Sequence, residues 1–161
     1  MKIIKLAIIS FVVLFGLLAA ITSLLPRTIR ISRAININAT QQQVHARVAD
    51  LKSWNSWNEY VKATTGAAVT ADSIHSTELS ISIRSIRPAS IETLWRQQRN
   101  RKTFPGVFNL FSGGTVTTVQ WYFDFHFSWY PWEKLGSITY DKQLGPQMEQ
   151  SLENLKKSLE P

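Results

Sequence analysis

The sequence predicts an α+β domain in which one long C-terminal helix lies across a curved antiparallel sheet, preceded by one transmembrane helix. Three patterns predict this fold: an uncharged apolar run near the N-terminus, several segments that alternate apolar with polar residues, and an apolar stripe of helical spacing at the C-terminus. The 161 residues include 18 Lys and Arg, 11 Asp and Glu, and no cysteine. The lack of cysteine excludes disulfides, thiol nucleophiles and cysteine metal sites.

The N-terminal apolar run covers residues 6–25 and carries no charge. A helix of this length spans about 30 Å, the thickness of the hydrocarbon core of a bilayer. We therefore expect residues 1–26 to be a membrane anchor and residues 27–161 to be one folded domain. A cleaved signal peptide is the alternative. The expected location is a single-pass position in a bacterial inner membrane. Basic residues flank both ends of the run, which leaves the side of the domain open, with the outside of the cytoplasm slightly favoured.

The first strand is expected at residues 28–38, where the alternate isoleucines share one face. Thr40 follows as a helix N-cap, and Gln43 stands at the position of a capping box. This pair predicts a helix that continues through Val44 and Val48.

A pair of tryptophans follows this helix. Trp54 and Trp57 are three residues apart, which places both on one side of a short helix that Ser53 begins. We expect the two indoles to close one end of the core. Residues 61–75 show no clear period and predict turns with one short strand.

Four longer strands are expected next, at residues 78–84, 91–99, 104–111 and 115–128. Ser112, Gly113 and Gly114 predict the hairpin turn between the last two. In the last strand, Trp121, Phe123, Phe125 and Phe127 share the inward face, whereas Tyr122, Asp124, His126 and Ser128 share the outward face.

The C-terminal helix carries the apolar stripe of Leu144, Met148, Leu152, Leu155 and Leu159. Gly145 and Pro146 interrupt the pattern. Because proline lacks an N–H and its ring crowds the carbonyl four residues before it, we expect a kink or a break there.

The opening segment of residues 31–57, the Gly-Thr strand start at residues 113–121 and the final helix at residues 144–156 together resemble the SRPBCC superfamily. This superfamily includes START-type lipid-transfer domains and polyketide cyclase/dehydrase-like proteins. The resemblance covers about residues 28–160 and implies the helix-grip fold, with an apolar cavity between the sheet and the long helix. The functions within this superfamily are diverse, so the resemblance implies little about the reaction.

A ligand-binding module is the first functional hypothesis. The resemblance implies a cavity, and the inward faces carry no charge, so the expected partner is a small hydrophobic or lipid-like molecule with no cofactor and no catalysis. The sequence leaves open whether these side chains line the cavity or fill it. The expected lining residues are Trp54, Trp57, Phe108, Leu110, Trp121, Phe123, Phe125, Met148 and Leu152.

An enzyme is the second hypothesis, of the polyketide cyclase/dehydrase or hydrolase type. Tyr122, Asp124 and His126 alternate along one strand, which allows the carboxylate to orient the imidazole and a proton to move along the row. The competing interpretation is a solvent-facing row opposite the buried aromatic residues. No His and carboxylate spacing in the chain matches a metal site.

The third hypothesis is a membrane-tethered interaction module with a basic surface that faces the lipid. Residues 84–102 hold six basic residues against Glu92. Next to a membrane anchor, anionic headgroups are a nearer partner than nucleic acid, which we do not expect. The arginines assigned to this contact are Arg96, Arg99 and Arg101; a plain solvated face is the alternative.

Overall fold

The computed structural model describes residues 2–24, 27–99, 101–126 and 139–160. The N-terminal part contains α1 (Lys2–Ser23), β1 (Thr28–Ile37), α2 (Gln41–Ala49), the 3₁₀ turn η1 (Leu51–Ser53), α3 (Trp54–Trp57) and α4 (Glu59–Lys62). The remainder contains β2 (Ala68–Val69), β3 (Ser73–His75), β4 (Leu79–Arg87), β5 (Ser90–Gln97), β6 (Thr103–Ser112), β7 (Thr117–His126) and α6 (Tyr140–Leu159).

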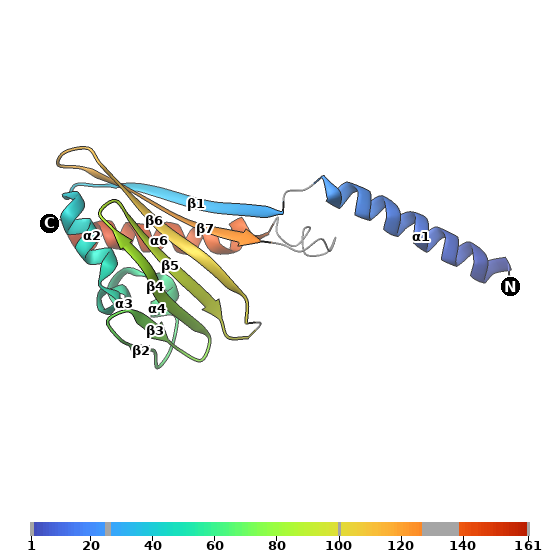
Figure 1. Cartoon of the computed structure of the whole chain (residues 1–161), viewed down its shortest axis with the longest axis horizontal. Helices are drawn as coiled ribbons and strands as arrows, with labels where there is room; N and C mark the ends of the chain where they lie inside the picture. Colours follow the sequence, from blue (N-terminus) through green and yellow to red (C-terminus); the bar gives the residue numbers. More distant parts are fainter. Residues whose placement is uncertain (1, 25–26, 100, 127–138, 161) are drawn as a thin grey trace.

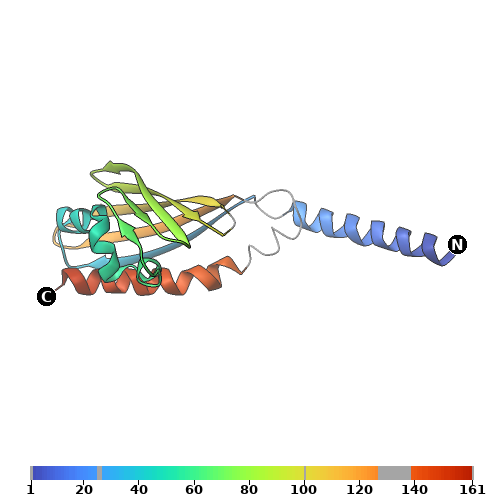
Figure 2. The ribbon, with the colours of Figure 1, turned by 90° about the horizontal axis from the view of Figure 1, so that it is seen from below.

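The seven strands form one antiparallel sheet in the order β1-β7-β6-β5-β4-β3-β2. α6 runs along one face of this sheet, and α1 extends away from the domain (Figures 1 and 2). The first strand pairs with the last, and their register places Thr28 opposite His126. The fold is the helix-grip architecture that the sequence predicted.

One end of the sheet lies next to the point where the chain leaves α1. Thr28 pairs with His126 there, and further across the sheet Arg96 pairs with both Thr103 and Ser80. Since the strands are antiparallel neighbours, these residues mark the same end of the sheet, which we call the α1-proximal end. α2 lies at the opposite end (Figure 1).

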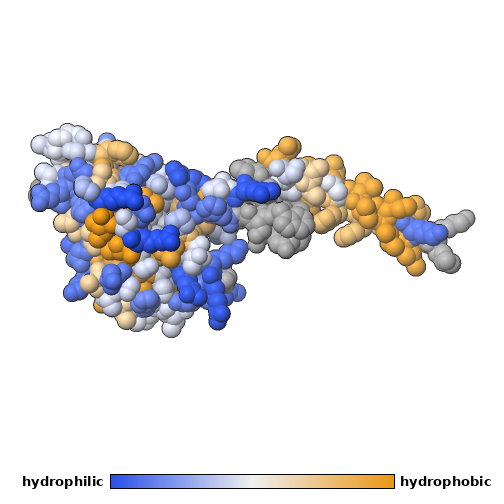
Figure 3. All heavy atoms as spheres, viewed as in Figure 1, coloured by the Kyte–Doolittle hydropathy of each residue, from blue (hydrophilic) through white to orange (hydrophobic). Residues whose placement is uncertain are grey.

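Apart from Ala19 and Thr22 near its end, α1 is exposed from Ile3 onward, and it is apolar enough to cross a membrane over Ile3–Ser23. Figure 3 shows its hydrophobic surface beside the more hydrophilic surface of the domain. A signal sequence near an N-terminus has the same length and composition, so this helix fits either interpretation.

The capping box that begins α2 is confirmed. The Thr40 hydroxyl accepts from the Gln43 backbone N–H, and the Gln43 side chain accepts from the Thr40 backbone N–H. Ser53 stands at the N-cap position directly before α3, as expected. Its hydroxyl makes no cap hydrogen bond and donates instead to the carbonyls of Arg47 and Asp50, at 2.8 and 2.7 Å. The chain therefore enters α3 directly from η1, so no separate cap is required.

Residues 61–75 contain two short strands, β2 and β3, where we expected one; the added strand is only Ala68–Val69, too short to show a period. Of the kink or break expected at Pro146, the break is absent: α6 continues through Pro146, because packing of its buried face outweighs the loss of one hydrogen bond. The kink stays a prediction. Phe127 and Ser128, expected in the last strand, lie outside the described residues.

Arg33 fastens α6 to β1 across the segment that contains Pro146. Its guanidinium pairs with Asp141 at 3.0 Å and with Glu149 at 2.6 Å, one on each side of Pro146. Gly145 is buried where the guanidinium crosses the helix, and a β-carbon at this position would overlap Arg33. Glycine at this position therefore leaves room for the arginine.

A double-mutant cycle tests this relation. Gly145→Ala in the parent chain should displace Arg33 from its two carboxylates and leave stability unchanged or lower. In an Arg33→Ala background the space is free, and alanine should stabilise the helix by about 0.8–1 kcal/mol relative to glycine. Urea unfolding of the four proteins measures the coupling. Additive effects of the two substitutions would show that the absence of a side chain at Gly145 does not matter for the position of Arg33.

Candidate functional site

The nine residues expected to line the cavity are all buried on the side of the sheet that faces α6 and the short helices. Phe125 is the most exposed of them, at 8%. The structure brings them into one cluster: Phe108 stacks on Trp121 with centroids 4.8 Å apart, and Trp54 lies 5.1 Å from Trp57. Leu110, Phe123, Met148 and Leu152 belong to the same buried core.

Three aromatic residues in this cluster were not identified from the sequence. Trp95 lies 5.9 Å from Trp121 and 5.1 Å from Phe123, and Phe104 lies 4.8 Å from Phe125. Tyr60 meets Trp95, Trp121 and Phe123 edge to face. The alternation of Ile91, Thr93 and Trp95 would have placed Trp95 on the inward face.

Thr93 is a fully buried hydroxyl within this aromatic cluster. It donates to the Gly106 carbonyl at 2.8 Å and accepts from Trp95 Nε1 at 2.9 Å. A β-carbon at Gly106 would come within 2.7 Å of the Phe123 ring and 2.8 Å of Trp95 Nε1. Glycine is therefore required at this point for the two rings to close over β6.

The buried indole N–H groups differ in whether they have a hydrogen-bond acceptor. Trp54 Nε1 donates to the Val48 carbonyl at 2.8 Å, and Trp57 Nε1 donates to Ser53 Oγ at a longer 3.4 Å. Trp121 Nε1 is buried and has no acceptor among the described residues. A buried donor without an acceptor is unfavourable, so this N–H is a place where an acceptor from outside the chain would be stabilising.

Tyr60 connects the aromatic cluster to α6. Its hydroxyl donates to the Leu144 carbonyl at 2.9 Å. Burial raises the pKa of the Tyr60 phenol, because the anion would be poorly solvated among the rings, and nearby Arg33 only partly opposes this shift.

The raised pKa of Tyr60 predicts a loss of stability at alkaline pH. In the unfolded chain this phenol ionises near its ordinary pKa of 10.0, whereas in the folded domain it stays protonated to higher pH. Its stabilising contribution is therefore complete below pH 10 and decreases as the pH rises. Above pH 10, the unfolding free energy of the Tyr60→Phe protein should therefore fall less steeply with pH than that of the parent, by up to about 1.4 kcal/mol per pH unit. Urea unfolding of both proteins on either side of pH 10 measures it, and equal slopes would contradict it.

Tyr122, Asp124 and His126 lie on the other face of the sheet, away from α6. Both carboxylate oxygens of Asp124 accept from Arg30, at 2.7 and 2.8 Å, and this hydrogen bond raises the pKa of Arg30. The Arg30 guanidinium also lies 4.0 Å above the Tyr122 ring. Asp124 therefore orients Arg30 and not His126, and this row forms an ion pair on the outer surface.

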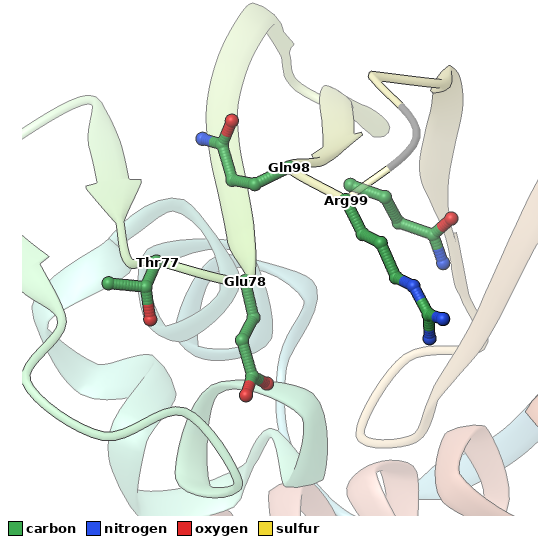
Figure 4. A pocket seen from close by; sticks show the side chains of 5 residues that line it. Thr77, Glu78, Gln98 and Arg99 are labelled. Carbon is green, nitrogen blue, oxygen red and sulfur yellow. The ribbon is translucent and has the colours of Figure 1, made fainter.

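A cavity of about 900 Å³ opens at the α1-proximal end. Figure 4 shows the side chains of Glu78 and Arg99 directed into this space. None of the nine expected residues belongs to its described lining, which consists of Thr77, Glu78, Gln97, Gln98 and Arg99. Two turns that are distant in the sequence, β3–β4 and β5–β6, form the lining together, so no local sequence pattern indicates this cavity.

The arginines of the expected basic surface belong to the same region. Arg96, Arg99 and Arg101 are exposed, and none forms an ion pair with another described residue. Arg101 has φ of 54°, in the left-handed region, which closes the turn between β5 and β6. In the part of the chain that the structure describes, no group of three His, Cys, Asp or Glu side chains is arranged to hold a metal ion.

Comparison with known proteins gives the following matches. A family model described as polyketide cyclase / dehydrase and lipid transport matches residues 28–160. No curated protein matches the chain significantly. A START superfamily protein from Mycobacterium smegmatis is 15% identical, with a TM-score of 0.58 over 81% of this chain and 97% of that chain. A conserved protein from Geobacillus kaustophilus is 10% identical, with a TM-score of 0.61 over 81% and 95% of the two chains.

DynU16, a protein from the dynemicin biosynthetic locus, is 15% identical with a TM-score of 0.56 over 81% of this chain. The present chain spans about half of it, 47% of its length. At these identities the solved structures establish the fold alone.

Proposed function

Because the chain belongs to the polyketide cyclase/dehydrase and lipid-transport family, we propose that its domain binds a small hydrophobic or lipid-like molecule between the sheet and α6 and is held at a membrane by α1. The observation that carries this proposal is the chemistry of the interior. The fully buried residues of the strands and of α6 are mostly aromatic and aliphatic, and none of them is charged. Such a surface selects ligands by shape and apolar area. The inward face of β1 does carry a charge, contrary to the expectation from the sequence: Arg33 pairs there with Asp141 and Glu149 of α6, at the partly exposed edge of the interior.

The Trp121 indole adds one polar feature to the proposed ligand. Its N–H has no acceptor among the described residues, although it is fully buried. A carbonyl, ether or hydroxyl oxygen on the bound molecule would supply that acceptor. We therefore propose a ligand that is largely apolar and carries at least one oxygen.

Binding requires space that side chains occupy in this structure. The first turns of α6 are the part best suited to move, because Pro146 has no N–H to donate to the Lys142 carbonyl and the bond in that turn is missing. The ion pairs of Arg33 span this segment with side chains that are partly exposed, so they cost little to separate. Movement of residues 140–146 would admit a ligand to the aromatic cluster.

Met148→Trp tests whether the interior accepts a ligand. Residues 27–161, with folding checked by a cooperative melting transition, should increase the fluorescence of the apolar probe N-phenyl-1-naphthylamine. The larger indole should fill the space beside Leu152 and abolish that increase, while overpacking costs about 1–3 kcal/mol of stability.

Gln147→Trp is the matched control. Gln147 is exposed on the same turn of α6, so its replacement should leave probe binding unchanged. If the parent domain fails to bind the probe or any other apolar molecule, the interior is a solid core and the ligand-binding proposal is wrong.

The anchoring proposal has its own test. The full chain, expressed with its N-terminus intact, should remain in the membrane pellet after treatment with alkaline carbonate or high salt. These treatments release peripheral proteins, whereas a helix of about twenty apolar residues that spans the bilayer stays inserted. Intact-mass measurement should show the complete α1. A mature chain that begins near Ser23 would identify a cleaved signal peptide instead.

A further inference from the structure

The cavity at the α1-proximal end lies outside the buried aromatic cluster, because none of its described lining residues belongs to that cluster. Its position on the domain restricts what it can bind. α1 ends at Ser23 and β1 begins at Thr28. Four residues separate them, and the five steps from Ser23 to Thr28 reach at most about 17 Å in a fully extended chain, so this end of the domain must lie close to the membrane that holds α1. The cavity is therefore on the side of the domain nearest the lipid headgroups.

The wall of the cavity is held by hydrogen bonds between the two turns. The Gln98 backbone N–H donates to the Glu78 carbonyl at 2.9 Å. The Gln98 side chain donates to Ser80 Oγ at 2.7 Å. These bonds fix the turn that carries Arg99 against the start of β4, which gives the polar lining a defined shape.

Along the inward face of β5, the polar lining of the cavity gives way to the aromatic side chains of the buried cluster. Gln97 borders the cavity, and Trp95, two residues earlier, lies on the same face of the strand. Trp95 stacks on Phe104 with centroids 6.4 Å apart, and this pair begins the aromatic cluster. A molecule with a polar head and an apolar tail matches this order of surfaces, with its head at the cavity and its tail toward Trp121.

The charges at the cavity favour an anionic head. Arg99 lines it, and Arg101 is exposed in the same turn between β5 and β6 without an ion pair to a described residue. Glu78 faces the same space and would repel a second negative charge (Figure 4). A phosphodiester, with one negative charge, therefore suits a cavity that holds both an arginine and a glutamate better than a doubly charged phosphomonoester does.

We propose that the Arg99 cavity holds the phosphodiester headgroup of an amphiphile drawn from the bilayer that anchors the chain, while the acyl part enters the aromatic interior. This rests on the proposed ligand-binding function and adds the ligand class and the route by which the ligand arrives.

Brominated acyl chains test the proposal, because bromine quenches tryptophan only at contact distance. The full chain is placed in nanodiscs with Trp129 and Trp132 replaced by Phe, so that the remaining tryptophans are the four buried ones. Brominated phosphatidylglycerol should quench them more strongly than brominated diacylglycerol, which lacks the phosphate. Added inorganic phosphate should not reverse the quenching, since the headgroup remains covalently attached to its acyl chains.

Arg99→Gln should weaken the apparent binding of brominated phosphatidylglycerol by roughly tenfold, as the loss of a charge-assisted hydrogen bond predicts. Arg84→Gln, an exposed arginine outside the cavity lining, should change nothing. Equal quenching by both lipids, or a full preference retained in Arg99→Gln, would overturn the headgroup site and leave the apolar interior intact. Reversal by inorganic phosphate would also overturn it, by showing a site for free phosphate. Absence of quenching by either lipid would overturn both proposals.

Discussion

The packing of α6 across the aromatic face of the sheet is the constraint on which the rest of this structure depends. Met148, Leu152 and Leu155 are buried against that face, and none of the buried residues of α6 is charged. Close packing in the interior explains both special glycines: Gly106 admits the rings above β6, and Gly145 admits Arg33 beside α6. The same packing creates the apolar interior, so stability and the proposed ligand binding depend on the same residues.

Much of the architecture follows from local sequence patterns. Alternation identified the longer strands, the four- and three-residue spacings identified α6, and Thr40 with Gln43 identified the start of α2, because each signal is contained within a few residues. Contacts between distant segments were beyond such reasoning. The pairing of β1 with β7, the span of Arg33 from Asp141 to Glu149, and the cavity between two turns each depend on how remote parts of the chain meet.

Sequence patterns predicted one part of the candidate site better than another. The inward row of β7 was identified as a buried aromatic face, and the structure places it there, but the role of those residues as a ligand site remains a proposal. Tyr122, Asp124 and His126 share a face as expected, yet Arg30 from the neighbouring strand takes both oxygens of Asp124. A row of residues on one strand does not reveal which charge its cross-strand neighbour supplies. That neighbour makes Asp124 one half of a surface ion pair with Arg30.

Native mass spectrometry of the full chain released from its own membrane is the sharpest test of ligand binding in the interior. We expect a population heavier than the sequence mass by one amphiphile, which dissociates as a single molecule and is absent from the Met148→Trp protein. A single peak at the sequence mass, under conditions that preserve known lipid complexes, would show that α6 and the sheet form a solid core.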